Sequence, residues 1–490
     1  MLNGQLEEHR RIYERTLRLV LILAMHELYP KVRVRFENSL NGGIFITVQG
    51  MLLDRHVIAT LSAKMQDIID AKMEIRKVRM SKKDAVDYFG SIGRNDTVRM
   101  LNYRMYEYCD VYEVGSLKEY CYGDVAGNTS EVPYFGIWLH LPGMVLTMPF
   151  DDFSKGPDPF VNKPKLESVY AHASRISRML GWENAADINE LVLSGKTREL
   201  IRISEAIQAD EIMQIARWIL ERGARSVFIS GPSSSGKTTF AHRLSIDLKA
   251  LGRTTLPISL DDYYRPDEEI PIGPDGQLDL ECPGALDIPL FNDHLIALLN
   301  GKKVQIPTYS FHSRNRTQEK EPIQMDERSI LLIEGIHGLN PGVGEGVPAD
   351  SSFKIFVYPA VQLNLDDHNR IRTTDLRLLR RAVRDIRMRN TPVIQTLQMW
   401  DNVRNGERIY VRPYQESADL IFNSFQPYEF SVFKKYAMDM FKSVPRDDPH
   451  YAMARRQVKF LNYFAACRDE DEIPPTSIVR EFIGGNTFYE

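Results

Sequence analysis

The sequence predicts an α/β domain with a parallel sheet flanked by helices, preceded by an α+β domain and followed by a helical tail. Three observations predict this arrangement. Short apolar runs alternate with helical patterns from residue 226 onward, a glycine-rich loop follows the first of these runs, and a proline-rich stretch precedes the whole region. Apolar runs without polar alternation are typical of strands that are buried on both faces of a parallel sheet.

Residues 1–150 are predicted to mix helices with short antiparallel strands. The expected elements are a helix that Pro30 ends, strands at 32–36 and 43–48, a helix at 61–71, a strand at 76–80 and a helix that Ser81 caps. Apolar and basic residues alternate over 32–36, as in a half-buried strand, and residues 41–43 supply the turn of a hairpin. We therefore assign residues 1–150 to an α+β domain.

Residues 151–222 are predicted to be a proline-rich linker with helices. Four prolines lie close together at its start, namely Pro149, Pro157, Pro159 and Pro164. Proline at this density breaks both helix and sheet. Helical patterns resume at 166–180, 187–193 and 201–222.

Residues 223–430 are predicted to form the α/β domain, and residues 431–490 the helical tail. Strands are expected at 227–230, 255–260, 330–333, 353–357 and 420–422, with helices between them. In the tail, helices are expected at 428–440 and 452–465. The apolar face of the last of these helices fits either core packing or a contact between two copies in a homo-oligomer.

The composition excludes several classes of protein. The 490 residues correspond to about three domains, and 43% of them are hydrophobic, which is enough for several cores. The net charge of −4 disfavours a globally basic nucleic-acid binder. The four cysteines form no CxxC pair, which indicates free thiols in a reducing compartment. Because the apolar stretch at 19–25 is too short to span a bilayer, we expect a cytoplasmic protein without a membrane segment.

The strongest signal is a glycine-rich segment, Gly231-Pro232-Ser233-Ser234-Ser235-Gly236-Lys237-Thr238-Thr239, which fits the P-loop pattern G-x-x-x-x-G-K-[ST]. A predicted strand precedes it and an amphipathic helix follows it. The glycines let successive backbone N–H groups face an anion, and the helix N-terminus adds partial positive charge. We expect Lys237 to reach the outer phosphates of ATP and the Thr238 hydroxyl to ligate Mg²⁺.

Two further strands are predicted to deliver carboxylates to the same edge of the sheet. The strand at 255–260 is followed by Asp261, and the strand at 330–333 is followed by Glu334. Asp261 is placed to accept the proton of an attacking hydroxyl and to lie close to the metal. Glu334 fits the Walker-B position, at which a carboxylate holds Mg²⁺ directly or through water. The alternative for Asp261 is that it caps the following turn. The alternative for Glu334 is that an acidic residue ends this strand by chance.

Four arginines share one face of a predicted helix, because Arg377, Arg380, Arg381 and Arg384 lie at i, i+3, i+4 and i+7. A concentrated guanidinium face suits the oxygens of a transferring phosphoryl group. The alternative is a solvated charged face, which is less favoured because almost no acidic residues interleave with these arginines.

These motifs resemble the uridine kinase and phosphoribulokinase family of P-loop kinases over residues 226–433. The matching segments are the P-loop, 261–265, 309–311, 334–341 and the arginine helix. The resemblance implies that Asp261 is the catalytic base, that Glu334 lies near Mg²⁺, and that the four arginines belong to a closing lid. Closure of such a lid would exclude water and suppress wasteful hydrolysis of ATP.

The resemblance also implies a nucleoside pocket, with two departures from the family pattern. The implied pocket residues are Tyr264, Glu281, Tyr309, Phe311, His312, Arg314 and Arg316. Where simple uridine kinases carry Phe-Asp-His-Pro in the ribose-binding segment, this sequence has Leu280-Glu281-Cys282-Pro283. The segment 309–316 is more compact than in those kinases. A nucleoside is still the expected acceptor, but a preference for pyrimidines does not follow.

The N-terminal domain resembles the second N-terminal, editing-type domain of threonyl-tRNA synthetases. The similarity runs through residues 27–30, the following hairpin, and Tyr120-Cys121-Tyr122-Gly123. The synthetase domain uses an H-x-x-x-H pair, whose positions here are occupied by Val20 and Ala24. Since two imidazoles are needed to handle a water and an ester, we do not expect editing, and we expect Cys121 to be structural.

The leading hypothesis is an ATP:nucleoside 5′-phosphotransferase that uses Mg²⁺, in which Lys237 and the lid arginines stabilise the developing charge. One alternative is a P-loop kinase of another small alcohol, such as a sugar phosphate or pantothenate. Another alternative is a tRNA-linked regulatory protein whose P-loop serves as a switch. Apart from tRNA, we do not expect a nucleic acid as a partner. The sequence leaves open the nucleoside, the preferred phosphate donor, the oligomeric state and the role of the N-terminal domain.

Overall fold

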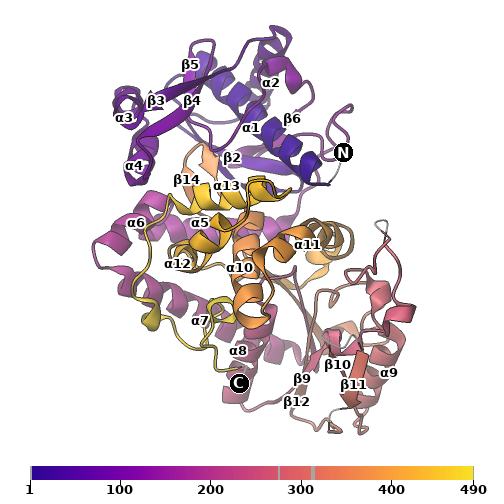
Figure 1. The fold of residues 1–490 in the computed structure, drawn as a ribbon. Coiled ribbons are helices and arrows are strands. Elements are labelled where there is room, and N and C mark those ends of the chain that lie inside the picture. The colour runs from indigo at the N-terminus through magenta and orange to yellow at the C-terminus, as the bar shows by residue number, and fades with distance from the viewer. Residues whose placement is uncertain (1–2, 274–275, 311–314, 320, 489–490) are drawn as a thin grey trace. The chain divides into compact units, whose positions relative to one another are not determined.

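The computed structural model describes residues 3–273, 276–310, 315–319 and 321–488, and the chain folds into two compact units (Figure 1). The first unit comprises Met1–Ser194, Val361–Thr373 and Lys459–Ala466. The second comprises Gly195–Ala360, Thr374–Val458 and Cys467–Glu490. This division differs from the four consecutive segments expected from the sequence, because two later segments make their contacts with residues of the first 194.

The first unit combines helices with antiparallel strands, as predicted for the N-terminal part. A four-stranded sheet has the order β1-β2-β7-β6, and a three-stranded sheet has the order β3-β4-β5. Its strands are β1 (Arg33–Leu40), β2 (Gly43–Gln49), β3 (Arg76–Ser81), β4 (Tyr108–Val114), β5 (Leu117–Glu119), β6 (Gly136–His140) and β7 (Gly143–Thr147). Its helices are α1 (Asn3–Leu28), α2 (Arg55–Asp70), α3 (Lys82–Ser91), α4 (Asn95–Tyr103), α5 (Pro164–Leu180) and α6 (Ala185–Leu193).

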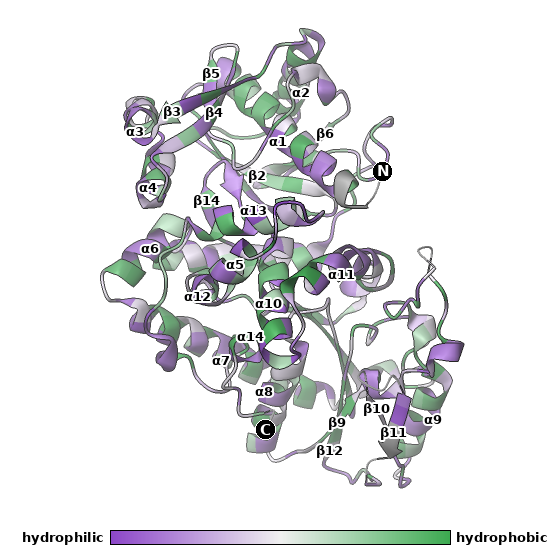
Figure 2. Cartoon of the chain, viewed as in Figure 1, coloured by the Kyte–Doolittle hydropathy of each residue, from purple (hydrophilic) through white to green (hydrophobic). Residues whose placement is uncertain are grey.

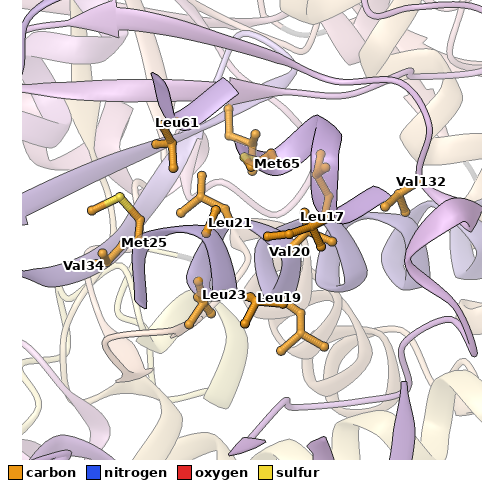
Figure 3. Close-up of a cluster of buried hydrophobic side chains, with 14 of the residues drawn as sticks. Leu17, Leu19, Val20, Leu21, Leu23, Met25, Val34, Leu61, Met65 and Val132 are labelled. Carbon is orange, nitrogen blue, oxygen red and sulfur yellow. The ribbon is translucent and has the colours of Figure 1, made fainter. Parts of the chain in front are cut away.

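Helix α1 forms the centre of the core of the first unit. All side chains at positions 13–25 are buried, and Figure 2 shows both apolar and polar colouring along this helix. Figure 3 shows Leu21 on the side of Leu61 and Met65, whereas Leu19 and Leu23 point the other way. Its buried side chains are mostly apolar but include Glu14, Arg15 and Arg18, so α1 is a core helix that also carries buried charges. None of the helices among the described residues is long and apolar enough to cross a membrane.

A segment from far along the chain completes the first unit. It carries β14 (Asn364–Asp366) and β15 (Asn369–Arg370), which pair as a short hairpin. The Asn364 side chain donates to the Phe36 carbonyl at 2.8 Å, and the Phe36 N–H donates to the Asp367 carbonyl at 2.9 Å. These bonds satisfy buried polar groups on both sides, so the hairpin is part of the fold of this unit.

The second unit is built on a five-stranded sheet with the order β16-β13-β8-β12-β9. Every strand pair in it is parallel, which confirms the predicted α/β class. The strands are β8 (Ser226–Ser230), β9 (Thr254–Ser259), β12 (Ser329–Glu334), β13 (Ser352–Tyr358) and β16 (Leu420–Asn423). A separate two-stranded sheet pairs β10 (Pro307–Ser310) with β11 (Asn315–Glu319).

Helices flank this parallel sheet. They are α7 (Thr197–Arg222), α8 (Lys237–Ala250), α9 (Ile288–Leu299), α10 (Thr373–Met388), α11 (Val393–Gly406), α12 (Glu429–Lys442), α13 (Tyr451–Leu461) and α14 (Arg480–Ile483). Helix α8 packs against β9 and β12, as can be followed in Figure 1. Because the strands are parallel, all their carboxyl ends meet at the edge of the sheet from which α8 departs.

Helix α13 ends earlier than the sequence pattern suggested. The helix was expected to continue to residue 465 but ends at Leu461. The amide of Asn189 donates to the Tyr463 carbonyl at 2.7 Å and accepts from the Ala465 N–H at 2.7 Å. Since these bonds take the place of helical ones, the chain leaves the helix here.

Candidate active site

The P-loop lies between β8 and α8, where the sequence places it. A side chain at Gly231 would come within 2.2 Å of the Val357 carbonyl oxygen, so only glycine fits there. Gly236 is the N-cap of α8 and has φ +89°, a conformation that L side chains rarely adopt. These two glycines let the loop turn sharply, and the first N–H groups of α8 then face outward toward an anion.

Lys237 begins α8 and points into the loop. Its Nζ donates to the Pro232 carbonyl at 3.3 Å, and its side chain is buried. Burial lowers the pKa of Lys237, while the carboxylates of Glu334 and Asp261 oppose that shift. The ammonium therefore lies between the loop and two acidic groups, where a bound triphosphate would compensate its charge.

Glu334 ends β12, the strand between the P-loop strand and β9. In the sheet it is level with Ile229 of β8 and Ser259 of β9. Its Oε1 accepts from the Thr238 hydroxyl at 3.4 Å and from the Ser259 hydroxyl at 3.5 Å. Burial raises the pKa of Glu334 to about 7, against the opposing effect of Lys237.

These oxygens fit a Mg²⁺ ion that arrives with a nucleotide. Among the described residues no group of three His, Cys, Asp or Glu side chains could hold a metal alone. Mg²⁺ in phosphate-transfer sites takes one or two protein oxygens and fills its other positions with water and substrate phosphates. Thr238 and Glu334 would supply those oxygens, and the ion would neutralise charge on the phosphates.

Asp261 lies directly after β9, in a short helical turn that Ser259 caps. Its side chain is exposed, and among the described residues none hydrogen-bonds to its carboxylate. The surrounding protein raises the pKa of Asp261, Lys237 opposes this rise, and Asp262 adds to it. An accessible carboxylate with a raised pKa has the properties of a general base.

Two of the four predicted lid arginines hold the P-loop from behind. Arg377 donates from Nε to the Ser233 carbonyl at 2.9 Å, and Arg380 donates from Nη1 to the Ser235 carbonyl at 3.2 Å. Both side chains are fully buried. Arg377 pairs with Glu407, and Arg380 binds Glu429 through two hydrogen bonds of 2.6 and 2.8 Å.

The other two lid arginines lie nearer the acidic groups. Arg381 donates to the Ser233 hydroxyl at 3.0 Å, and burial lowers its pKa. Arg384 pairs loosely with Asp385 at 3.6 Å and contributes to the electrostatics of Asp261. Arg389, one turn beyond, was not predicted. Arg384 and burial lower the pKa of Arg389 to about 10, and Asp261 opposes that shift.

Three of the predicted acceptor-pocket residues lie together. The Tyr264 hydroxyl donates to the Leu280 carbonyl at 2.8 Å, and its ring lies 5.3 Å from that of Tyr309. Burial raises the pKa of Glu281 to about 7, while Arg381 opposes the rise. A side chain at Gly406 of α11 would come within 2.4 Å of the Glu281 Cβ, so α11 packs directly against this carboxylate.

The remaining pocket predictions have different outcomes. Arg316 donates to Asp287 at 3.1 Å and to the Tyr263 carbonyl at 3.5 Å, so its guanidinium is held at the start of α9. Phe311, His312 and Arg314 lie outside the described residues. Their assignment to the pocket stays a prediction.

Several residues at the site had no sequence signal. Glu407 and Glu429 reach the arginines from α11's continuation and from α12, far along the chain. Glu481, in the C-terminal segment, accepts from the Thr239 hydroxyl at 2.7 Å. None of these three was given a role from the sequence, and only the fold brings them to the P-loop. Arg389 lies five residues after Arg384 and just beyond the end of α10, so the i+3 and i+4 spacing of the arginines does not reach it.

In the first unit, the two positions at which the expected resemblance would place a histidine pair are apolar and buried. Val20 and Ala24 both belong to the core around α1. Burial raises the pKa of the Cys121 thiol to about 12, so the thiolate is not available near neutral pH. These three residues provide no group for acid–base or nucleophilic chemistry.

Comparison with known proteins finds similar proteins for residues 227–430. The model of the Phosphoribulokinase / Uridine kinase family matches residues 227–430. A uridine kinase of Lactobacillus helveticus is 28% identical over 194 residues, which cover 39% of this chain and 83% of that protein. A uridine kinase of Tolumonas auensis is 28% identical over 196 residues, with coverage of 39% and 83%.

One solved structure, titled "Structure of a Possible Uridine Kinase from Bacillus stearothermophilus", is 18% identical, covers 44% of this chain and 98% of that chain, and has a TM-score of 0.31. That similarity is too low to identify the fold, which is established by the strand order and the P-loop. Residues 227–430 are therefore similar to the P-loop kinases of the matched family, and this similarity supports a phosphotransferase. The match leaves the first unit outside it.

Proposed function

We propose that this protein transfers the γ-phosphoryl group of MgATP to the 5′-hydroxyl of a nucleoside. The observation that carries the proposal is the position of Asp261, which shares its electrostatic surroundings with Lys237 and Arg384 beside the P-loop. A hydroxyl bound there would attack in line, and Asp261 would accept its proton. Relatives that are similar to this part of the chain include uridine kinases.

Glu281 and the Tyr264–Tyr309 pair support a nucleoside as the acceptor. Two aromatic rings 5.3 Å apart offer a surface against which a planar base can stack. Glu281 offers two acceptor oxygens for the ribose hydroxyls once it is ionised. A carboxylate with a pKa of about 7 is ionised by about half near neutral pH.

Lys237, Arg381 and Arg384 have the charge that the transferring phosphoryl group requires. Arg377 and Arg380 act differently in this proposal, because carboxylates and P-loop carbonyls already bind their guanidinium groups. They are positioning residues that fix the loop. Mg²⁺, held through Thr238 and Glu334, would neutralise charge on the outer phosphates.

The alternative acceptor is another small alcohol, such as a sugar phosphate or pantothenate. The specific observation in its favour is Arg316, which is engaged with Asp287 rather than available to a base. A basic group is still present in Arg381 beside Glu281. An acceptor with its own anionic group would use that arginine.

A panel of acceptors tests the proposal. Each nucleoside, sugar phosphate and pantothenate is incubated with ATP and Mg²⁺, and acceptor-dependent release of ADP is measured. We expect at least one nucleoside to stimulate ADP release, and its 5′-deoxy analogue to give none. Activity with no nucleoside would refute the proposal, and activity with only another alcohol would establish the alternative.

For the first unit we propose a structural or regulatory role rather than ester hydrolysis. The absence of histidine at positions 20 and 24, and the thiol of Cys121 with its raised pKa, support this. A salt-sensitive shift of tRNA without phosphorylation of any nucleoside would instead favour a tRNA-linked regulatory protein.

A further inference from the structure

The C-terminal segment of the chain lies directly on the P-loop helix. Residues 467–490 belong to the same compact unit as the P-loop. Ser477 anchors the segment, because its hydroxyl donates to Glu205 at 2.6 Å, the same carboxylate oxygen that accepts from Tyr428. Ile478 then packs on the loop itself, since a side chain at Gly236 would come within 2.4 Å of the Ile478 Cγ2.

Glu481 is the polar contact of this segment with the nucleotide-binding loop. Its Oε2 accepts from the Thr239 hydroxyl at 2.7 Å and from the Thr239 N–H at 3.3 Å. Thr239 directly follows the P-loop motif, which ends at Thr238, and its N–H belongs to the first turn of α8. The N–H groups of a P-loop cradle the α- and β-phosphates. A carboxylate oxygen thus occupies donors that a phosphate oxygen uses.

Two further contacts hold the segment along α8. The Asn486 side chain is buried and donates to the Thr239 hydroxyl at 3.4 Å. The ring of Phe488 stacks on His242 one turn further along, with ring centres 5.1 Å apart and planes inclined by 11°. The segment therefore follows α8 beyond the phosphate-binding turn.

The charge of Glu481 also bears on the site. It opposes the lowering of the Lys237 pKa by burial and adds to the rise in the Glu334 pKa, so it acts on the same groups that would bind MgATP. A fixed negative charge at this place attracts the lysine ammonium and repels a triphosphate. A phosphate oxygen could take the place of the Glu481 carboxylate oxygen at Thr239 with little change in geometry. The reason is that carboxylate and phosphate oxygens accept the same hydrogen bonds.

We propose that the C-terminal segment 478–488 is an autoinhibitory strap, in which Glu481 occupies the α-phosphate position at Thr239 and must be displaced before ATP binds. The strap competes with the nucleotide from within the same chain. This inference rests on nucleotide binding at the P-loop, as the proposed function does, but not on which acceptor is phosphorylated.

Titration with MgADP tests the strap, because this nucleotide carries the α-phosphate and cannot be turned over. Glu481→Gln keeps the shape of the side chain and removes its charge. We expect its Kd for MgADP to be about tenfold lower than that of the wild type, equivalent to about 1.4 kcal/mol. The matched control is Glu472→Gln, which removes one charge from the same tail where Glu472 pairs with Arg202 on the surface. We expect the control to bind as the wild type does.

Hydrogen exchange of the full chain gives a second readout. We expect MgADP to increase exchange of the amides at 478–488 in the wild type, since the strap is released. Protection of these amides by MgADP, or weaker binding by Glu481→Gln, would overturn the strap and show that the segment completes the nucleotide site. Equal Kd values for MgADP in the wild type and in Glu481→Gln would overturn the strap but not the kinase function. Binding by neither protein would overturn both the strap and the kinase function.

Discussion

At the scale of single residues, the proposed reaction depends most on the carboxylate of Asp261. It is accessible, its pKa is raised, and its neighbours Lys237 and Arg384 are cationic. Asp261→Asn should lower kcat by about 100- to 10,000-fold, because the attacking hydroxyl loses its proton acceptor. The Kd for ATP should stay within a few-fold of the wild-type value, as measured by calorimetric titration.

The control for this substitution is Asp293→Asn, which changes an exposed carboxylate on α9. It should leave kcat unchanged. A near-normal kcat in Asp261→Asn would show that another group accepts the proton.

Glu281 predicts a pH dependence of acceptor binding. With a pKa of about 7, its ionised fraction rises about tenfold between pH 6 and pH 8. The KM for the acceptor should fall by about the same factor over this range, because only the carboxylate accepts bonds from two ribose hydroxyls. In Glu281→Gln the KM should be higher at pH 8 and nearly independent of pH. Steady-state kinetics at saturating ATP measures the acceptor KM of the wild type and of Glu281→Gln at each pH.

The stability of the free protein gives the matching check. The pKa of Glu281 is raised in the folded state from an ordinary value of 4.5, so the folded state binds the proton more tightly. This contribution to stability is complete below about pH 4.5 and is lost as the pH rises through about 7. The wild type should therefore lose stability relative to Glu281→Gln over that window in urea unfolding. A constant difference would contradict the assignment of the raised pKa.

At the scale of elements, helix α10 clamps the P-loop through buried ion pairs. Arg380 and Glu429 are fully buried and share two hydrogen bonds. Glu429→Gln leaves the guanidinium buried beside a neutral amide, and loss of one partner of such a pair costs about 3–5 kcal/mol. We expect a fall of that order in the free energy of unfolding, measured with urea, and a weaker affinity for ATP.

A surface pair provides the control for the clamp. Lys435→Gln breaks its pair with Glu470, in which the lysine side chain is about half exposed, and should cost no more than about 1 kcal/mol. The double variant Arg380→Met, Glu429→Leu should recover part of the stability lost in Glu429→Gln, because neither charge is then left unpaired. Equal losses in Glu429→Gln and Lys435→Gln would contradict the clamp.

The elements of the parallel sheet could be predicted from the sequence because their signals are local. Apolar runs bounded by turns gave all five strands, and the P-loop pattern placed β8 and α8. The roles within α10 could not be separated in this way. Arg377 and Arg384 lie on the same helix face, but Glu407 reaches only Arg377, and it comes from a different part of the chain. The contact of Glu481 with Thr239 could not be predicted either, because these two residues are also far apart in the sequence.

At the scale of the whole molecule, the chain passes between its two units more than once. The segment 361–373 leaves the kinase sequence between β13 and α10 and belongs to the first unit. Its buried side chains include Leu363, Leu365 and Asp366. No local pattern in 361–373 shows which part of the chain would cover it, so consecutive domain boundaries were the natural expectation.

This arrangement predicts that residues 195–490 are not stable alone. Without residues 1–194, the hydrogen bonds from Asn364 to Phe36 and from Asn369 to Tyr120 are lost, and two leucines become exposed. The fragment should bind a hydrophobic dye and melt at a lower temperature than the full chain. A fragment that binds no dye and melts as the full chain does would show that the segment folds independently.

The central claim is that this chain phosphorylates the 5′-hydroxyl of a nucleoside, and one measurement tests it most directly. The full chain is incubated with ATP labelled in its γ-phosphate, Mg²⁺ and each nucleoside in turn, and the labelled product is identified. We predict a nucleoside 5′-monophosphate that carries the label, absent with the 5′-deoxynucleoside and absent with Asp261→Asn. Label that remains in ATP or appears only as free phosphate with every nucleoside would contradict the claim.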